Sequence, residues 1–185
     1  MSDTDPIPAW PAEDHHCAPC DLHYAHIGPA EVRETAGAAA DLAGAAVRDI
    51  TRAAGPEALR RRPAPGVWSA LEYVCHLRDV YAVYTVRLHR ARTEHRPALE
   101  PMLNELRARR FGYNRLPPAA VLTELRCNAE GLRAELDRAR DLDRPVRRRP
   151  GEQRTARWLA RQVLHETRHH LDDLRGGTTE GGAAR

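Results

Sequence analysis

The sequence predicts an all-α protein, and three features of the 185-residue chain support this fold class. Four long segments carry the apolar periodicity of helices, and Pro, Gly or a capping residue bounds each of them. No segment shows the alternation that is typical of strands, and the turn signals lie far apart. Because long helices joined by loops bury their apolar faces against one another, we expect a four-helix bundle.

The first two helices have clear beginnings. We expect the first over residues 29–54, since Pro29 suits a first turn and Gly55-Pro56 ends the pattern. Ser69-Ala-Leu-Glu72 matches a capping box, in which the Ser hydroxyl and the Glu carboxylate each satisfy a free backbone N–H. The second helix therefore begins at this box and runs to about Thr93.

The second half of the chain predicts two more long helices. Pro117-Pro118 opens a helix that lasts to about residue 140, and a further helix spans residues 155–175. Gly176-Gly177 stands ready as its C-terminal stop. The pattern over residues 102–110 is ambiguous and allows a short helix.

The chain divides into three parts. Residues 1–28 show no helical period and carry several Pro, so we expect an extended N-terminal arm that contains Cys and His. Residues 29–176 form the bundle. We expect residues 177–185, which are rich in Gly and Thr, to be a disordered tail.

Composition excludes several function classes. The formal net charge is +3, and the Arg runs at residues 60–62 and 147–149 lie in loops bounded by Pro. They form no basic stripe with base-reading partners, so we expect no nucleic-acid partner. No apolar run approaches the roughly 20 residues of a membrane span, and the acidic N-terminus lacks the pattern of a signal peptide. We therefore expect a cytoplasmic protein without a membrane partner.

His165-Glu-Thr-Arg-His169 places two imidazoles one turn apart on the last helix, with directions that differ by roughly 40°. Both can reach one ion, and zinc, nickel and iron(II) all accept neutral imidazole. The pair lies off the apolar stripe, on a face shared with Trp158, Gln162 and Asp172. For an isolated pair the alternative is a chance arrangement on a solvated face.

His76 strengthens the case for a metal. It lies in line with Tyr73, Val80 and Val83, on the face of the second helix that should point inward. A lone His on such a stripe is commonly a core residue with one hydrogen bond. A tripod of His76, His165 and His169 accounts for all three residues together, and three protein ligands leave coordination positions open, as in a catalytic metal site. We expect His89, His95 and His170 to be surface groups or to lie outside the ligand set.

Cys17-Ala-Pro-Cys20 is the second candidate site. In a cytosolic chain a Cys-x-x-Cys pair serves metal or redox chemistry more often than a structural disulfide. The pair could complete a second metal site with His15, His16 or His23, form a redox couple, send one thiolate to the main metal, or be structural. We expect the other two cysteines, Cys75 and Cys127, to be ordinary small buried residues.

Residues 62–80 (Arg-Pro-Ala-Pro-Gly-Val-Trp-Ser-Ala-Leu-Glu-Tyr-Val-Cys-His-Leu-Arg-Asp-Val) and 163–173 (Val-Leu-His-Glu-Thr-Arg-His-His-Leu-Asp-Asp) resemble the DinB-like (DinB/YfiT-like) family, which is related to the mycothiol-dependent maleylpyruvate isomerases. The resemblance covers roughly residues 30–175. It implies a bundle of up-down-down-up topology, often dimeric, whose metal is held by His76 from the second helix and by His165 and His169 from the last. Some relatives carry Cys-x-x-Cys followed by Gly-Phe-Asp, and this chain lacks the Gly-Phe part.

The resemblance implies a metal-dependent thiol S-transferase or isomerase. Its cofactor would be a divalent metal, with zinc expected first and nickel or iron as alternatives, and its partners a bacterial low-molecular-weight thiol such as mycothiol and an electrophilic substrate. An open metal position binds a thiol as thiolate and lowers its pKa, which suits this chemistry. We expect a homodimer, and Glu166 and Tyr73 are the candidate catalytic residues.

Two alternatives stay open. His165-Glu166-Thr-Arg-His169 fits the His-Glu-x-x-His pattern, in which the Glu serves as general base, so hydrolysis by a metal-activated water is the second hypothesis. The third is a non-enzymatic module that binds metal or responds to stress.

Overall fold

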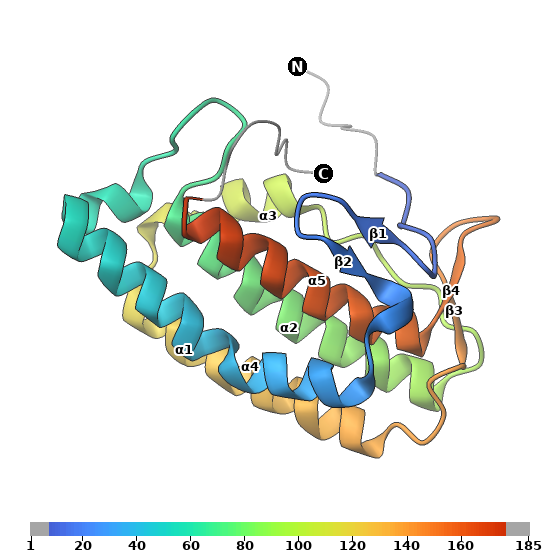
Figure 1. Cartoon of the computed structure of the whole chain (residues 1–185). Helices are drawn as coiled ribbons and strands as arrows, with labels where there is room; N and C mark the ends of the chain where they lie inside the picture. The colour runs from blue at the N-terminus through green and yellow to red at the C-terminus, as the bar shows by residue number, and fades with distance from the viewer. Residues whose placement is uncertain (1–7, 177–185) are drawn as a thin grey trace.

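The computed structural model describes residues 8–176, so the predicted tail at 177–185 lies outside the described residues. Its framework is a bundle of four long helices (Figure 1). These helices are α1 (Pro29–Ala54), α2 (Ala70–Thr93), α4 (Pro118–Arg138) and α5 (Ala156–Leu174). The shorter helical elements are α3 (Asn104–Arg110) and the 3-10 turns Tyr24–His26, Pro56–Arg60 and Tyr113–Arg115.

The bundle has the up-down-down-up order. In Figure 1, α1 and α5 run in one direction, and α2 and α4 run in the opposite direction. α4 and α5 each pack against both α1 and α2. α1 and α2 therefore lie diagonally opposite each other across the bundle. The prediction of an all-α four-helix bundle is confirmed, and the ambiguous stretch before α4 holds one short helix.

Local signals explain where the helices begin and end. The Ser69 side chain accepts a hydrogen bond from the backbone N–H of Glu72, and the Glu72 carboxylate accepts one from the backbone N–H of Ser69, so the predicted capping box is present. Thr155 caps α5 by accepting from the N–H of Trp158. Gly55 ends α1 with a φ of 80°, a conformation that glycine adopts without a steric penalty.

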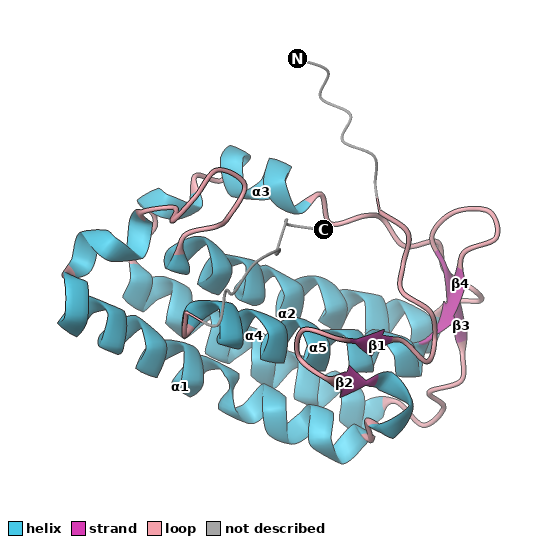
Figure 2. Cartoon of the chain, turned by 45° about the horizontal axis from the view of Figure 1, so that its top comes forward, coloured by secondary structure: helices cyan, strands magenta, loops and turns pink. Residues whose placement is uncertain are grey.

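Residues 8–28 of the predicted N-terminal arm pack against the bundle. β1 (His16–Cys17) and β2 (Leu22–His23) pair in an antiparallel hairpin, which lies against α5 in both views (Figures 1 and 2). Five apolar side chains of the arm join the core of the bundle: Trp10, Cys17, Leu22, Tyr24 and Ile27.

A second hairpin, β3 (Pro145–Arg147) with β4 (Gln153–Thr155), leads directly into α5. The prediction that the chain has no strand was therefore wrong in detail. Strands of two or three residues are too short to show an alternation of apolar and polar residues, so the sequence carries no signal for them.

Apolar side chains from the four long helices fill the core, and many of them are fully buried. Cys75 is buried as expected, whereas Cys127 is exposed on α4. Among the described residues, no helix combines the length and the apolar character that crossing a membrane requires.

Candidate metal centre

The start of α2 places His76 in the interior. The capping box fixes the first turn, and the Glu72 carboxylate of this box forms an ion pair with Arg62 at 2.8 Å. His76 follows about two turns later and is only 2% exposed. The ring of Trp68, the residue before the cap, lies 5.0 Å from the imidazole between centroids.

α5 presents two pairs of polar side chains over little more than one turn. His165 and His169 form one pair, and Glu166 and His170 form the other, each with a spacing of four residues. The second pair is rotated from the first by roughly 100°, because it begins one residue later on the helix. The two pairs therefore face different neighbours.

The pair of Glu166 and His170 faces α2 and forms a cluster with His76, which we call the α2–α5 cluster. The Oε2 atom of Glu166 lies 3.0 Å from Nε2 of His76 and 3.2 Å from Nε2 of His170. The three atoms lie within 4.8 Å of one another, a separation that allows all of them to bind one ion. The glutamate and His170 side chains are 20% and 16% exposed, so the cluster reaches the surface.

Hydrogen bonds with further side chains orient His170 and Glu166. Nδ1 of His170 lies 2.8 Å from Oδ2 of Asp173, which leaves Nε2 directed at the cluster. Gln162 donates to Oε1 of Glu166 at 2.7 Å and accepts from the hydroxyl of Tyr24 at 2.5 Å. Metal-binding histidines commonly carry such a carboxylate on their other ring nitrogen.

The electrostatics of the α2–α5 cluster favour a carboxylate anion beside imidazoles. Burial disfavours the charged form of Glu166, but hydrogen bonds with His170 and His76 outweigh it and hold its pKa well below the ordinary value. Burial also opposes the charge of His170, yet Asp173 and Glu166 raise its pKa to about 9. Burial lowers the pKa of His76. The negative charge of the cluster therefore lies on the Glu166 carboxylate, and a cation that binds Nε2 of His170 would displace the proton that this nitrogen carries.

The pair of His165 and His169 faces the arm and forms a second cluster with Cys17 and Cys20, which we call the hairpin–α5 cluster. Sγ of Cys17 lies 3.7 Å from Nδ1 of His169, and the ligand atoms of all four residues lie within 4.8 Å of one another. Both ring nitrogens of His165 are buried, and neither has a hydrogen-bond partner among the described residues.

Burial controls the protonation of the hairpin–α5 cluster. It raises the pKa of Cys20 to about 12, with a further contribution from the hydrogen bond to Cys17, while the backbone N–H of Leu22 acts in the opposite sense. It lowers the pKa of His165 to about 4, so this imidazole is neutral at pH 7.

Comparison with known proteins agrees with the fold. Residues 39–174 match the DinB superfamily. This chain belongs to the DinB superfamily. It is also similar to the solved structure of YfiT from Bacillus subtilis, with a TM-score of 0.70 and 19% identity over 81% of this chain and 85% of that one. That structure is described as a probable metal-dependent hydrolase with an unusual four-helix bundle topology. No curated protein matches the chain.

The structure divides the three histidines that the sequence placed in one site. His76 lies with Glu166 and His170, whereas His165 and His169 lie with the two cysteines. The pair that faces α2 in this DinB protein is the one that begins at Glu166, one residue later than predicted. The sequence held a signal for it, because Glu166 and His170 have the same four-residue spacing and Asp173 follows three residues on. His170, expected outside the ligand set, lies within the cluster.

The two candidate catalytic residues both lie close to the α2–α5 cluster. The Glu166 carboxylate lies between the imidazoles of His76 and His170 and contacts both of them. The Tyr73 ring lies 5.1 Å from that of His170, and burial raises its pKa to about 12, so the phenol stays protonated at neutral pH. Their catalytic roles stay predictions.

The missing Gly of the Cys-x-x-Cys-Gly-Phe-Asp pattern has a structural counterpart. Asp21 occupies the Gly position and adopts a φ of 48°, the left-handed conformation that favours glycine. Aspartate tolerates this conformation better than most residues. The hairpin of this DinB protein therefore keeps its turn without glycine, and Leu22, in the Phe position, is buried.

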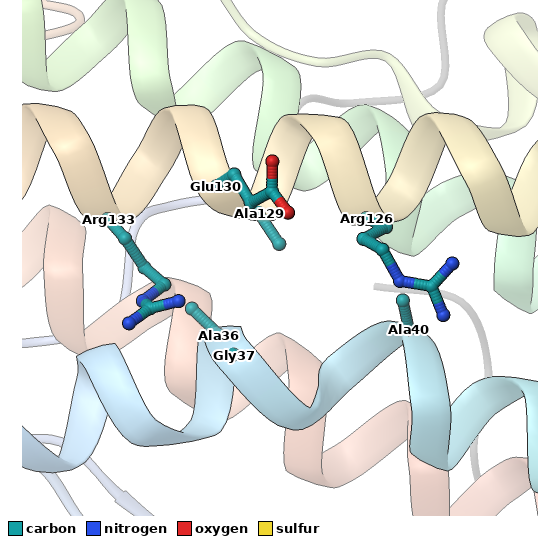
Figure 3. Close-up of a pocket in the computed structure, with 7 residues that line it drawn as sticks. All are labelled: Ala36, Gly37, Ala40, Arg126, Ala129, Glu130 and Arg133. Carbon is teal, nitrogen blue, oxygen red and sulfur yellow. The ribbon is translucent and has the colours of Figure 1, made fainter.

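Two other features of the described residues lie outside both clusters. His16, Asp21 and His23 form an exposed group on the outer side of the hairpin. A hollow between α1 and α4 is lined by small residues, one Glu and two Arg (Figure 3): Ala36, Gly37, Ala40, Arg126, Ala129, Glu130 and Arg133. None of these lining residues belongs to either cluster.

Proposed function

We propose that this DinB-superfamily protein is a metal-dependent hydrolase whose divalent ion is held by His76, Glu166 and His170. The observation that carries the proposal is the convergence of two imidazole nitrogens on one carboxylate oxygen, at 3.0 and 3.2 Å. Two histidines and one glutamate are a ligand set of catalytic zinc sites that act on water. Three protein ligands leave positions open for a nucleophile and a substrate.

The surrounding residues fit this role. Asp173 keeps Nε2 of His170 directed at the ion, as outer-shell carboxylates do in metalloenzymes. Gln162 holds the second oxygen of Glu166, so Oε2 is the one presented to the cluster. When bound, a divalent metal supplies Lewis-acid activation of water and of a substrate oxygen. Zinc is the first candidate, and nickel and iron stay alternatives, since imidazole and carboxylate suit all three.

The description of YfiT as a probable metal-dependent hydrolase agrees with this proposal. The thiol S-transferase or isomerase that uses mycothiol rests on the family resemblance alone, and it requires the same open metal positions. The non-enzymatic module requires the metal but no turnover. These two functions are therefore outcomes of the same experiment.

The test loads the full-length protein with zinc, nickel or iron(II) and assays it against a panel of esters, amides and phosphoesters, and against electrophiles with added mycothiol. We expect metal-dependent hydrolysis that His76→Asn abolishes and His89→Asn leaves unchanged, because His89 is exposed on the same helix. Turnover only with the thiol would replace hydrolase by transferase. Metal binding without either activity would favour the binding module.

Three further expectations from the sequence belong to this proposal and stay predictions. They are a cytoplasmic location, a homodimer, and partners that are small molecules rather than nucleic acid or membrane. Fractionation of cells and light scattering on the purified protein would test the first two directly.

A further inference from the structure

The Cys-x-x-Cys segment folds into a turn that presents both sulfurs to α5. Cys17 is the last residue of β1 and pairs with Leu22, the first residue of β2. Cys20 lies in the turn between them, and the backbone N–H of Leu22 forms a hydrogen bond with its sulfur. Asp21 makes the turn possible with its left-handed backbone. Cys17 is buried and Cys20 half-buried, so neither thiol stands free at the surface.

The four donor atoms of the hairpin–α5 cluster lie close enough together to bind one ion. Zinc binds sulfur at about 2.3 Å and imidazole nitrogen at about 2.0–2.1 Å, so a sulfur and a nitrogen on one tetrahedral ion lie about 3.6 Å apart. Sγ of Cys17 and Nδ1 of His169 lie 3.7 Å apart. All four ligand atoms, including those of Cys20 and His165, fall within 4.8 Å of one another.

His165 supplies an independent observation. Both of its ring nitrogens are buried without a hydrogen-bond partner among the described residues. A neutral imidazole has one nitrogen that can accept a hydrogen bond, and burying such a polar atom without a partner destabilises the folded state. A cation that binds one of these nitrogens would remove part of this destabilisation.

We propose that Cys17, Cys20, His165 and His169 bind one Zn²⁺ in a closed site that fastens the N-terminal hairpin to α5. Two thiolates and two imidazoles in tetrahedral positions are the ligand set of structural zinc sites. Coordination replaces the proton of each thiol, and both protons pass to the solvent. Four protein ligands leave no position for a substrate, so this ion differs in role from one held by the α2–α5 cluster.

The site also connects to the α2–α5 cluster through side chains. Tyr24 directly follows β2, and its hydroxyl donates to Gln162, which in turn donates to Glu166. A zinc ion that fixes the hairpin therefore fixes Tyr24, and with it the orientation of the glutamate. The inference about zinc does not depend on the proposed hydrolase, because it rests on a different set of ligands.

The experiment measures zinc and cobalt binding by the full-length protein purified with a thiol reductant. We expect the double variant Cys17→Ser/Cys20→Ser to bind one zinc ion per chain fewer than the wild type. After cobalt substitution we expect a thiolate-to-cobalt charge-transfer band that disappears in the double variant and that needs a higher cobalt concentration to develop in His165→Asn, which keeps both thiolates. Cys127→Ser is the matched control, since it removes an exposed thiol on α4 and should change neither result.

X-ray absorption on the zinc-loaded His76→Asn protein tests the ligands without altering them, so it holds even where the cysteine variants fold poorly. We expect two sulfur and two nitrogen neighbours. A zinc ion without sulfur neighbours, or a Cys17–Cys20 disulfide that persists under the reductant, would overturn the closed site. If the His76→Asn protein binds one metal ion fewer than the wild type and keeps the cobalt band, the closed site is intact. Such a result concerns only the α2–α5 cluster.

Discussion

The two clusters on α5 share one stretch of helix but differ in what completes them. The α2–α5 cluster takes its third ligand from a neighbouring helix of the bundle and keeps a partly exposed carboxylate. The hairpin–α5 cluster takes two sulfurs from a short hairpin far away in the sequence. Open positions and a carboxylate suit catalysis, whereas four ligands with two thiolates suit structure. Neighbouring residues on one helix can therefore serve different purposes when different elements cover their faces.

The outer shells of the two clusters differ as well. In the α2–α5 cluster, His170 has a second polar contact with Asp173, and Glu166 has one with Gln162. In the hairpin–α5 cluster, both nitrogens of His165 lack partners among the described residues. An ordered polar shell tunes reactivity, while a poorly satisfied one leaves the ion itself as the main stabilising partner.

The largest expected effect separates the clusters by a reciprocal pair of variants. His76→Asn should lower hydrolysis by more than about 100-fold, because even the loss of an outer-shell partner of a metal costs about 10–100-fold. It should leave the cobalt–thiolate band unchanged. His165→Asn should weaken that band by lowering the cobalt affinity of the hairpin–α5 cluster, and it should lower hydrolysis less than about tenfold. If either variant changed both readouts fully, the two clusters would be one site.

The next effect concerns Asp173 as the partner of His170. Asp173→Ala should weaken metal binding at the α2–α5 cluster by about 10–100-fold, since the imidazole loses the acceptor that orients it. Competition with a chelator would measure the affinity. Asp172→Ala is the matched control, because its side chain is 58% exposed one residue earlier. Equal losses in both variants would show that local charge, not orientation, matters.

Asp79 is an ion-paired carboxylate of the bundle that belongs to neither cluster, and its contribution to stability should depend on pH. Burial disfavours the charge of Asp79, yet hydrogen bonds from Tyr113 and Arg107, with the nearby Arg78, hold its pKa below the ordinary value. Because the pKa of Asp79 is lower in the folded state than in the unfolded state, its charge stabilises the fold fully above the unfolded pKa of about 3.9. This stabilisation is lost as the pH falls through the folded pKa.

Asp79→Asn should therefore cost about 2 kcal/mol in the free energy of unfolding at neutral pH, and the cost should shrink below about pH 4. Urea unfolding of metal-free protein at several pH values would measure it. Glu124→Gln, which removes an exposed partner of Arg78, should change stability little. A pH-independent cost for Asp79→Asn would mean that shape rather than charge is responsible.

The smallest effect tests the turn of the hairpin. Asp21→Val should destabilise the protein by about 1 kcal/mol, because a β-branched residue is strained at a φ of 48°. Asp21→Gly should stay within about 0.5 kcal/mol of the wild type, since glycine adopts this conformation and the lost ion pairs are exposed. Thermal unfolding would distinguish the two, and equal stability would contradict a strained turn.

The sequence by itself determined the helices, because their periodicity and end signals are local. The capping box at Ser69 and the stop at Gly55 come from residues within a few positions of one another, and the structure has both. The inward direction of His76 also followed from the apolar stripe of α2, and the residue is buried. The sequence also shows the chemistry of the candidate residues, which are imidazoles and thiols at metal-binding spacing.

Only the tertiary structure decided which residues meet. Two pairs with the same spacing begin one residue apart on α5, and spacing along a helix does not state which face another element covers. The packing of α2 selects Glu166 and His170, and the arm covers His165 and His169 and brings Cys17 and Cys20 to them. The hairpin that does so has strands of two residues, too short for any pattern. Contacts between segments more than 140 residues apart depend on the whole fold, so no local pattern predicts them.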